Sequence, residues 1–461
     1  MKNPESYSSV TPPGPSRLEL LKQLNKIRHN APEYLLDASR RYGDLVFFDV
    51  PRNPAYFINH PDLIKHVLLD NHRKYSKKTM QYNSLSEITG QGLLTSDGAY
   101  WLRQRQLMQP SFDRPRLMAL DRVIVPAALA MLERWEGIAH KGDPLDVDRE
   151  MMVLALEIVG KALFSIELSR EAKRLVDAVL TALDYIVGRA RNPTALSSQP
   201  FLLTPRKARF NAAVSTLDLT VYDMIYQRQA AGDAGDDLLG MLLRARDPQN
   251  GSPMTPEQVR DEVITILIAG HETVASALTW SCYLLAKNPP QWEQMHAEVS
   301  RVLGANLPTP ASLIDIPLTG QVFSEALRLY PPAWLITRKA IEADQIDGID
   351  IPAGASIIIS PYAVHRHPQF WEDPERFDPS RFSPEREINR PRFAYIPFGG
   401  GPRLCIGDQF AMIEAQTVLA MVTQRFRLEL LPHRPIEADS LVTIRPRHGL
   451  PMKIVRLNPA S

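Results

Sequence analysis

A single cysteine stands among clustered glycines near the C-terminal end of the chain. Cys405 follows the run Phe398-Gly399-Gly400-Gly401, and Gly407 and a helix-like pattern beginning near Phe410 come after it. A cysteine next to a helix N-terminus is favoured as a thiolate, because unpaired N–H groups and the helix dipole stabilise negative charge there. The glycines permit positive φ and allow a flat cofactor to approach the backbone. The pattern predicts a metal ligand, with a buried structural cysteine in a glycine-rich turn as the alternative.

A glutamate and a threonine lie in the middle of a long apolar segment. Its start, Thr255-Pro256-Glu257-Gln258, combines an N-cap threonine, a first-turn proline and a capping-box glutamine, and the predicted helix runs to Asn288. At 1.5 Å per residue this helix is about 48 Å long, enough to cross a domain. Polar groups at its centre need an explanation because their burial is costly. Without a function, Thr273 is expected to bond back to the Ala269 carbonyl, and Glu272 to reach solvent.

The composition is that of a globular protein. The chain has 461 residues, 44% hydrophobic and 23% charged, with a formal charge of +1, so neither nucleic acid nor an anionic membrane is expected as a partner. Cys282 and Cys405 lie far apart in unlike contexts, which argues against a disulfide framework and favours the cytoplasm. We expect a flexible tail over 1–16, without an apolar core for a signal peptide or a membrane anchor, and one domain over 17–461.

The elements around these residues are expected to be mostly helical. The predicted helices include Pro32–Arg41, Pro61–Asp70, Ala99–Gln109 and several within Leu117–Gln229. The predicted strands are Leu45–Val50, Ala55–Ile58, Phe426–Leu430 and part of Val442–Arg456, with a hairpin in Ile349–Ser360. Lys77–Leu94 is expected to be irregular, either a surface loop or the wall of an apolar pocket. The sequence therefore predicts a mainly α fold with small β-sheets.

Four motifs resemble those of the cytochrome P-450 superfamily of haem-thiolate monooxygenases. The pattern F-x-x-G-x-R-x-C-x-G over Phe398–Gly407 is similar to its haem-binding loop, and Ala269–Thr273 is similar to its acid–alcohol motif. Glu325–Arg328 and Pro374–Phe377 match its E-x-x-R and P-E-R-F motifs. The resemblance implies the cytochrome P-450 fold, with haem b (iron protoporphyrin IX) between the long central helix and the cysteine-ligand loop.

The resemblance also implies roles for individual residues. Cys405 would be the axial ligand of the iron, Glu272 would relay protons through ordered water, and Thr273 would stabilise the bound oxygen. Cofactor binding is implied for Trp101, Arg105, Arg338, His365, Phe398, Arg403, Cys405 and Gly407. A buried salt-bridge cluster would comprise Glu325, Arg328 and Arg376. Candidate substrate-pocket residues are Leu85, Ile88, Ala269, Ala333, Trp334 and Leu335.

Two neighbours of the acid–alcohol pair and several arginines complete these expectations. Gly270 would allow close approach of the haem, whereas His271 is expected to face other side chains rather than iron. Arg103 is expected to be solvated and, with Arg114 and Arg116, to face an acidic redox partner. The proline-rich break Asn192–Pro205 falls where family members carry a mobile lid, with a plain surface loop as the alternative.

The implied activity is monooxygenation, in which O2 and two electrons place one oxygen atom in a C–H bond of a large hydrophobic substrate. Because the sequence shows no flavin or iron–sulfur motif, electrons are expected from a ferredoxin or flavodoxin and its NAD(P)H-dependent reductase. A peroxide-driven hydroxylase and a non-enzymatic haem-thiolate sensor or carrier are the alternatives. Neither of them would need the pair Glu272-Thr273.

The substrate class follows from a narrower resemblance. The blocks Ala269–Trp280 and Glu325–Trp334 are most similar to the carotenoid-ring hydroxylase branch of thermophilic bacteria. This similarity implies hydroxylation of a β-carotene-type ring, bound largely through the hydrophobic effect. Fatty acids and terpenoids are the alternative substrates. A fatty acid would favour a cationic or hydroxyl anchor, and none can be identified from the sequence.

Overall fold

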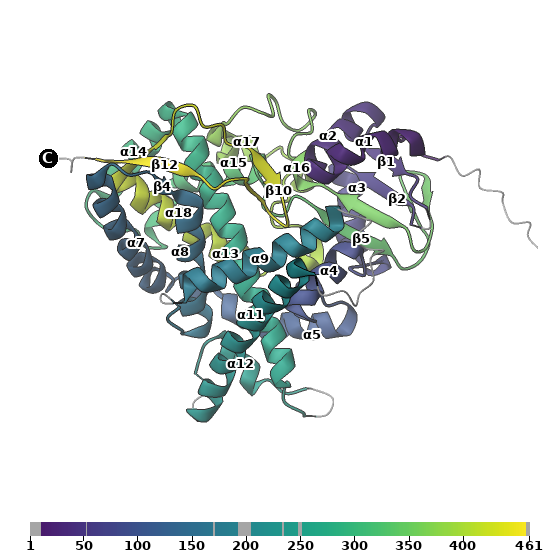
Figure 1. Cartoon of the computed structure of the whole chain (residues 1–461). Coiled ribbons are helices and arrows are strands. Elements are labelled where there is room, and N and C mark those ends of the chain that lie inside the picture. Colours follow the sequence, from purple (N-terminus) through teal and green to yellow (C-terminus); the bar gives the residue numbers. More distant parts are fainter. Residues whose placement is uncertain are drawn as a thin grey trace, which may run out of the picture. The chain divides into compact units, whose positions relative to one another are not determined.

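The computed structural model describes most of the chain (Figure 1). The described ranges are 11–51, 53–168, 171–191, 204–232, 235–247 and 251–457. The chain divides into two compact units. The β unit comprises Met1–Asn83, Trp334–Glu375 and Arg390–Cys405, and the helical unit comprises Ser84–Ala333, Arg376–Asn389 and Ile406–Ser461. The lid expected at Asn192–Pro205 lies outside the described residues up to position 203, and the single domain over 17–461 stays a prediction.

The helical unit is built around α13 (Pro256–Lys287), the long helix expected from the sequence. The Gln258 N–H donates to Thr255 Oγ1 at 3.2 Å and the Thr255 N–H donates to Gln258 Oε1 at 3.0 Å, which confirms the capping box. Among the described residues, α13 is the one helix long and apolar enough to cross a membrane, and 83% of its most apolar stretch is buried inside the protein. It therefore has the character of a core helix.

Helices α8, α11, α14 and α15 pack against α13, and the short strands lie at its edges. The other helices of this unit are α5 (Gly98–Met108), α6 (Arg114–Leu117), α7 (Asp121–Lys141), α8 (Val147–Phe164), α9 (Ala172–Arg191), α11 (Pro205–Ala230), α12 (Leu238–Arg244), α14 (Pro289–Leu303), α15 (Pro317–Leu329), α17 (Pro384–Glu387) and α18 (Asp408–Arg425). One sheet has the order β4 (Leu145–Asp146), β12 (Pro451–Arg456), β9 (Phe426–Leu430), and β10 (Ala438–Ser440) pairs with β11 (Ile444–Pro446).

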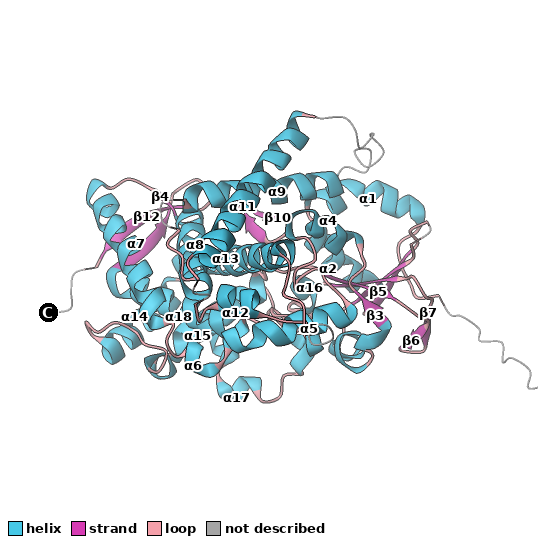
Figure 2. Cartoon of the chain, turned by 90° about the horizontal axis from the view of Figure 1, so that it is seen from below, coloured by secondary structure: helices cyan, strands magenta, loops and turns pink. Residues whose placement is uncertain are grey.

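The β unit contains a five-stranded sheet with the order β1-β2-β8-β5-β3 and a two-stranded ribbon, β6–β7; Figure 2 shows its strands in magenta. The strands are β1 (Leu45–Phe48), β2 (Ala55–Ile58), β3 (Tyr75–Ser76), β5 (Ile336–Ala340), β6 (Asp344–Ile346), β7 (Ile349–Ile351) and β8 (Ser356–Ile359). Its helices are α1 (Arg17–His29), α2 (Ala31–Tyr42), α3 (Pro61–Lys65) and α16 (Pro361–Val364). Ile357 and Ile359 alternate with less buried residues and enter the core of this unit.

The segment Lys77–Leu94 is not irregular, contrary to the prediction. It contains helix α4 (Met80–Thr89), in which Leu85 and Ile88 are buried at helical spacing. The intervening serines and asparagine have low helix propensity, because their side chains compete for backbone hydrogen bonds. Burial of the apolar face overrides that weak local preference.

The hairpin predicted in Ile349–Ser360 is also wrong. β7 pairs with β6, whereas β8 lies between β2 and β5 in the main sheet. Asp347 and Gly348 have φ values of 50° and 76°, as a two-residue type I′ turn requires, so they join β6 to β7. Pro352 follows β7 and has no N–H for a ladder, which separates the two strands into different sheets.

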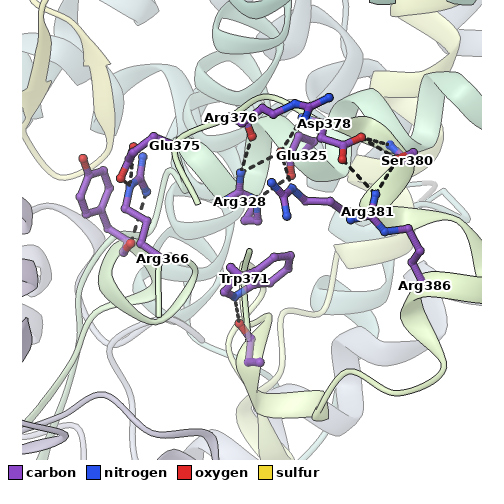
Figure 3. Close-up of polar contacts among 12 residues, drawn as sticks. Glu325, Arg328, Arg366, Trp371, Glu375, Arg376, Asp378, Ser380, Arg381 and Arg386 are labelled. Carbon is purple, nitrogen blue, oxygen red and sulfur yellow. Dashed lines mark hydrogen bonds and ion pairs between the residues drawn. The ribbon is translucent and has the colours of Figure 1, made fainter. Parts of the chain in front are cut away.

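A buried ion pair on α15 anchors the segment that follows Arg376 (Figure 3). Arg328 donates through Nε and Nη2 to the two oxygens of Glu325, at 2.6 and 2.7 Å, and both side chains are fully buried. Glu325 also accepts the Asp378 N–H at 2.9 Å and lies 3.4 Å from Arg381 Nε. Arg376 is exposed and contributes its carbonyl, 3.1 Å from Arg328 Nη2, rather than the predicted guanidinium. Arg381 occupies the place expected for Arg376.

Gly401, in the loop before Cys405, makes a close backbone contact. Its φ is 67°, and an added Cβ would lie 1.8 Å from the carbonyl oxygen of Leu68. Leu68 belongs to a π-helical turn, His66–Asp70, that continues α3. Both the conformation and the available space therefore require glycine.

The ion pair gives a first prediction. Arg328→Leu should lower the free energy of unfolding by about 3–5 kcal/mol, because it leaves the Glu325 carboxylate buried without its partner. Arg376→Ala is the control and should change it by less than about 0.5 kcal/mol, since the backbone carbonyl remains. Urea unfolding measures both. Similar losses in the two variants would mean that the Arg376 guanidinium is part of the cluster after all.

The loop glycine gives a second prediction. Gly401→Ala should destabilise the protein by at least about 3 kcal/mol, because strain at positive φ adds to the clash with Leu68. Gly354, with φ of 83° and open space around it, isolates the conformational part. Gly354→Ala should cost only about 1–2 kcal/mol. Equal thermal unfolding midpoints for the two variants would show that the Leu68 contact does not constrain the loop.

Candidate active site

The loop before Cys405 is closed by its own backbone. The Cys405 N–H donates to the Phe398 carbonyl at 3.0 Å. Gly399 and Gly401 have φ values of 74° and 67°, which confirms positive φ for two of the three glycines before the cysteine, whereas Gly400 is extended with a φ of −167°. Gly407 differs from expectation, because its φ of −103° is open to any residue. It serves as the N-cap position of α18, so Cys405 stands three residues before the first residue of that helix.

The two cysteines have opposite environments. Cys282 is fully buried in α13, and burial raises the pKa of its thiol to about 12. Cys405 is exposed. A thiolate is the form that binds metals, so Cys405 is the cysteine suited to ligation. This agrees with the role that the sequence motif implies.

The residues around the cysteine loop are held within the β unit. A hollow of about 130 Å³ is lined by residues 392–393, 395–400 and 404, Phe398 among them. His365 is fully buried, and its Nε2 accepts the Ile396 N–H at 2.9 Å. The neutral imidazole proton is then on Nδ1. His365 therefore fixes the backbone of the segment that leads to Phe398. Its contact with a haem propionate stays a prediction.

The arginines and tryptophan expected at the haem propionates have varied surroundings. Arg338 is largely buried and donates to the Thr337 carbonyl at 2.9 Å. Trp101 and Arg105 are half-buried, one turn apart on α5. Arg403 is half-buried and ends a short 3-10 turn, Gly401–Arg403. Their cofactor contacts stay predictions.

Arg103 is not simply solvated, contrary to the expectation. It forms an ion pair with Asp247, and its guanidinium lies 5.1 Å from the centre of the Tyr100 ring. Arg116 donates to the Asp236 carbonyl at 2.6 Å, whereas the side chain of Arg114 is exposed. These contacts occupy part of the basic surface on which a partner was expected to dock.

One short strip of α13 remains accessible. From Glu262 to Leu285 every residue is buried except Ala269, Gly270 and Thr273. A Cβ on Gly270 would lie 2.5 Å from Val159 Cγ2, so this glycine allows α8 to pack closely against α13. The contact therefore gives Gly270 a role in helix packing, whereas the sequence predicted a role in the approach of haem. Ala269 and Thr273 are one turn apart on one face. An uncovered strip at the centre of a core helix fits a flat cofactor, as does an exposed Cys405 in a glycine loop.

The acid–alcohol residues have distinct hydrogen bonds. Thr273 Oγ1 donates to the Ala269 carbonyl at 2.7 Å, as expected for a threonine inside a helix. Glu272 does not reach solvent, which corrects the expectation: it accepts the Thr443 hydroxyl at 2.7 Å and lies 3.8 Å from Arg445 Nη1. Burial raises the pKa of Glu272, and Arg445 and Thr443 oppose the rise. A carboxyl with a raised pKa keeps its proton to higher pH than an exposed one, which suits it to proton donation.

His271 lies inside the protein, as expected. Its Nδ1 is 2.6 Å from the Leu267 carbonyl, and its side chain is fully buried. Burial lowers the pKa of this imidazole to about 4. His271 is therefore neutral near pH 7 and adds no charge next to Glu272.

The candidate substrate residues fall into two groups. Ala269, Ala333 and Leu335 are at least partly accessible. Leu85, Ile88 and Trp334 are buried, and Ile88 is completely covered by protein. Ile88 is thus a core residue in this structure and does not line an opening, which corrects its assignment to the pocket.

Sequence reasoning missed the partners of Glu272. Arg445 Nη2 lies 2.5 Å from Asp148 Oδ2, so a second buried carboxyl joins the group. Thr443 and Arg445 alternate with Ile444, and such alternation places two polar side chains on one side of a strand. Such alternation is typical of a strand with one polar face in solvent. Only the fold reveals that these polar residues face the core.

Comparison with known proteins assigns the family. The cytochrome P450 family model matches residues 12–450. Cyclooctatin synthase of Streptomyces melanosporofaciens is 37% identical over 431 residues, covering 93% of this chain and 91% of that protein. Pentalenene oxygenase of Streptomyces avermitilis is 33% identical, covering 93% and 94%.

Two further comparisons extend this finding. Protein LUTEIN DEFICIENT 5, chloroplastic, of Arabidopsis thaliana is 30% identical over 431 residues, covering 90% of this chain and 72% of that protein. The crystal structure of the cytochrome P450DA heme domain has a TM-score of 0.87 and 25% identity, covering 98% of this chain and 99% of that one. The chain therefore belongs to the cytochrome P450 family and is a monooxygenase with haem b as its cofactor.

Proposed function

We propose that this monooxygenase hydroxylates a hydrophobic terpenoid. The observation that carries the proposal is the similarity to cyclooctatin synthase and pentalenene oxygenase, whose names refer to terpenoids, along nearly their whole lengths. The accessible residues Ala269 and Leu335 are apolar, which suits a neutral hydrocarbon bound by the hydrophobic effect.

A β-carotene-type ring is the more specific candidate within this class, since carotenes are terpenoid hydrocarbons. It is supported by the blocks Ala269–Trp280 and Glu325–Trp334 and by the similarity to LUTEIN DEFICIENT 5, whose name refers to a carotenoid. Fatty acids are the competing substrate class. The test below separates all three.

Each component of the proposed reaction has a separate role. Bound haem supplies oxygen activation, with Cys405 as its protein ligand. Glu272 holds a proton inside the protein, and Thr273 presents a hydroxyl at the accessible strip of α13. Electrons come from a ferredoxin or flavodoxin with its NAD(P)H-dependent reductase, and the proposed compartment is the cytoplasm.

The ligand assignment is tested by the two cysteines. Cys405→Ser should abolish the red-shifted Soret band that the ferrous carbon-monoxide complex of a thiolate haem shows, because serine cannot supply the sulfur ligand. Cys282→Ser is the matched control and should retain the band, since Cys282 is buried in α13. Persistence of the band in Cys405→Ser would disprove the assignment.

The substrate class is tested by comparing three candidate substrates. The enzyme with ferredoxin, reductase and NAD(P)H is given β-carotene, a cyclic sesquiterpene hydrocarbon and a long-chain fatty acid in separate reactions. We expect hydroxylated product from at least one of the two terpenoids, detected by mass spectrometry, and β-carotene product supports the narrower candidate. Oxidation confined to the fatty acid would overturn the terpenoid proposal and leave the monooxygenase assignment intact.

A further inference from the structure

The hairpin β10–β11 is hydrogen-bonded to one face of α13. The Thr443 hydroxyl donates to Glu272 Oε1 at 2.7 Å. The Ile444 carbonyl accepts the Ser276 hydroxyl at 2.7 Å and the Trp280 indole N–H at 2.9 Å. Glu272, Ser276 and Trp280 follow one another at four-residue intervals and share a face. The hairpin thus fixes Glu272 relative to the two turns of α13 that follow it.

The other strand of the hairpin is fastened as well. Arg191, the last residue of α9, donates through Nη2 to Asp439 Oδ1 at 2.6 Å and to the Ser440 carbonyl at 2.9 Å. Ser440 is paired with Ile444 in the antiparallel register. Because both strands are held, the position of Thr443 beside Glu272 is determined by the fold rather than by a free loop.

Arg445 is shared by two buried carboxyls. It lies 2.5 Å from Asp148 and 3.8 Å from Glu272, and all three residues are less than a tenth exposed. Asp148 also accepts the Thr279 hydroxyl at 3.3 Å. One guanidinium neutralises one carboxylate, and a second unpaired carboxylate would be strongly disfavoured in this environment. Burial raises the pKa of both carboxyls, but Arg445 lies much closer to Asp148, so Asp148 is the better-stabilised carboxylate and Glu272 is the carboxyl that keeps a proton.

The two oxygens of Glu272 are not equivalent. Oε1 accepts from Thr443 and faces Arg445, whereas Oε2 is buried and has no hydrogen-bond partner among the described residues. The charged groups that these contacts place around Glu272 are Arg445 and Asp148, and His271 on the same helix is neutral. Because Oε1 accepts the Thr443 hydroxyl and faces the Arg445 guanidinium, the proton of the neutral acid belongs on Oε2.

We infer that Thr443 and Arg445 are positioning residues: Thr443 donates to Glu272 Oε1, Arg445 lies 3.8 Å from the same oxygen, and together they leave the transferable proton on Oε2. The inference rests on the proposed role of Glu272 in proton supply and extends it to the C-terminal hairpin. Asp148 influences the pKa of Glu272 because the two carboxyls compete for Arg445. Loss of the Thr443 hydroxyl should make Glu272 harder to ionise, whereas loss of the Asp148 charge should make it easier.

Infrared spectroscopy of the substrate-free holoenzyme gives a readout that does not depend on turnover. The carbonyl stretch of protonated Glu272 is the band that Glu272→Gln removes, and its intensity is followed against pH. Thr443→Val should change the frequency of the band and make it persist to higher pH, because the pKa of Glu272 rises. Thr443→Ser should restore the wild-type titration. Asp148→Asn should shift the titration to lower pH. The opposite directions distinguish a positioning role from a general loss of structure.

Product formed per NAD(P)H is the second readout. Thr443→Val should lower it by up to about tenfold, the equivalent of one hydrogen bond, with hydrogen peroxide released instead, and Thr443→Ser should rescue it. If Glu272→Gln leaves this ratio unchanged, the proposed proton role of Glu272 fails. If Glu272→Gln lowers the ratio while Thr443→Val behaves as Thr443→Ser in both readouts, the inference on the hairpin is overturned and the proposed function stands.

Discussion

A helix buried along most of its length must find partners for its polar side chains inside the protein. In α13 this constraint organises the helical unit around it. Thr255 and Gln258 satisfy the first turn, Thr273 and Thr279 return to their own backbone, and Ser276 and Trp280 reach the Ile444 carbonyl. Glu272 needs another element, because a carboxyl has no such local partner. The C-terminal hairpin supplies one.

The same constraint acts near the N-terminal end of α13. Asp261 accepts the Gln91 N–H at 2.7 Å, and the buried Glu262 accepts the Leu93 N–H at 2.8 Å. An added Cβ on Gly92 would lie 2.0 Å from Thr265 Oγ1, so this turn packs directly on the helix. Carboxyl groups on a core helix thus serve as attachment points for segments that have few apolar residues of their own. The sequence contains these carboxyls, but their partners appear only in the fold.

Strong local signals made much of the fold predictable. The capping box gave the start of α13, and the bounds of β2 and β9 coincide with the predicted strands Ala55–Ile58 and Phe426–Leu430. The candidate site was predictable where a motif fixes a backbone, as at Gly399 and Gly401 before Cys405. These features depend on neighbouring residues, which a sequence displays directly.

The errors have the opposite origin, since they concern partners distant in sequence. The E-x-x-R and P-E-R-F motifs identify the neighbourhood of the cluster but not which arginine points inward, and Arg381 rather than Arg376 approaches Glu325. The burial of Glu272 cannot be predicted locally because Thr443 and Arg445 stand about 170 residues further along the chain. Local pattern also could not show that β8 pairs with β2 and β5 instead of β7.

The π-helical turn His66–Asp70 places a constraint on how this protein can change during evolution. The Asn71 N–H donates to the His66 carbonyl at 2.8 Å, the wide spacing that sets the direction of the neighbouring Leu68 carbonyl. Deletion of one residue here would rotate the following chain by about 100° around the helix axis. The Leu68 carbonyl would then leave its place beside Gly401. Side-chain changes that keep this backbone preserve the contact with Gly401, whereas a one-residue insertion or deletion does not, so the structure constrains the length of the segment more than its sequence.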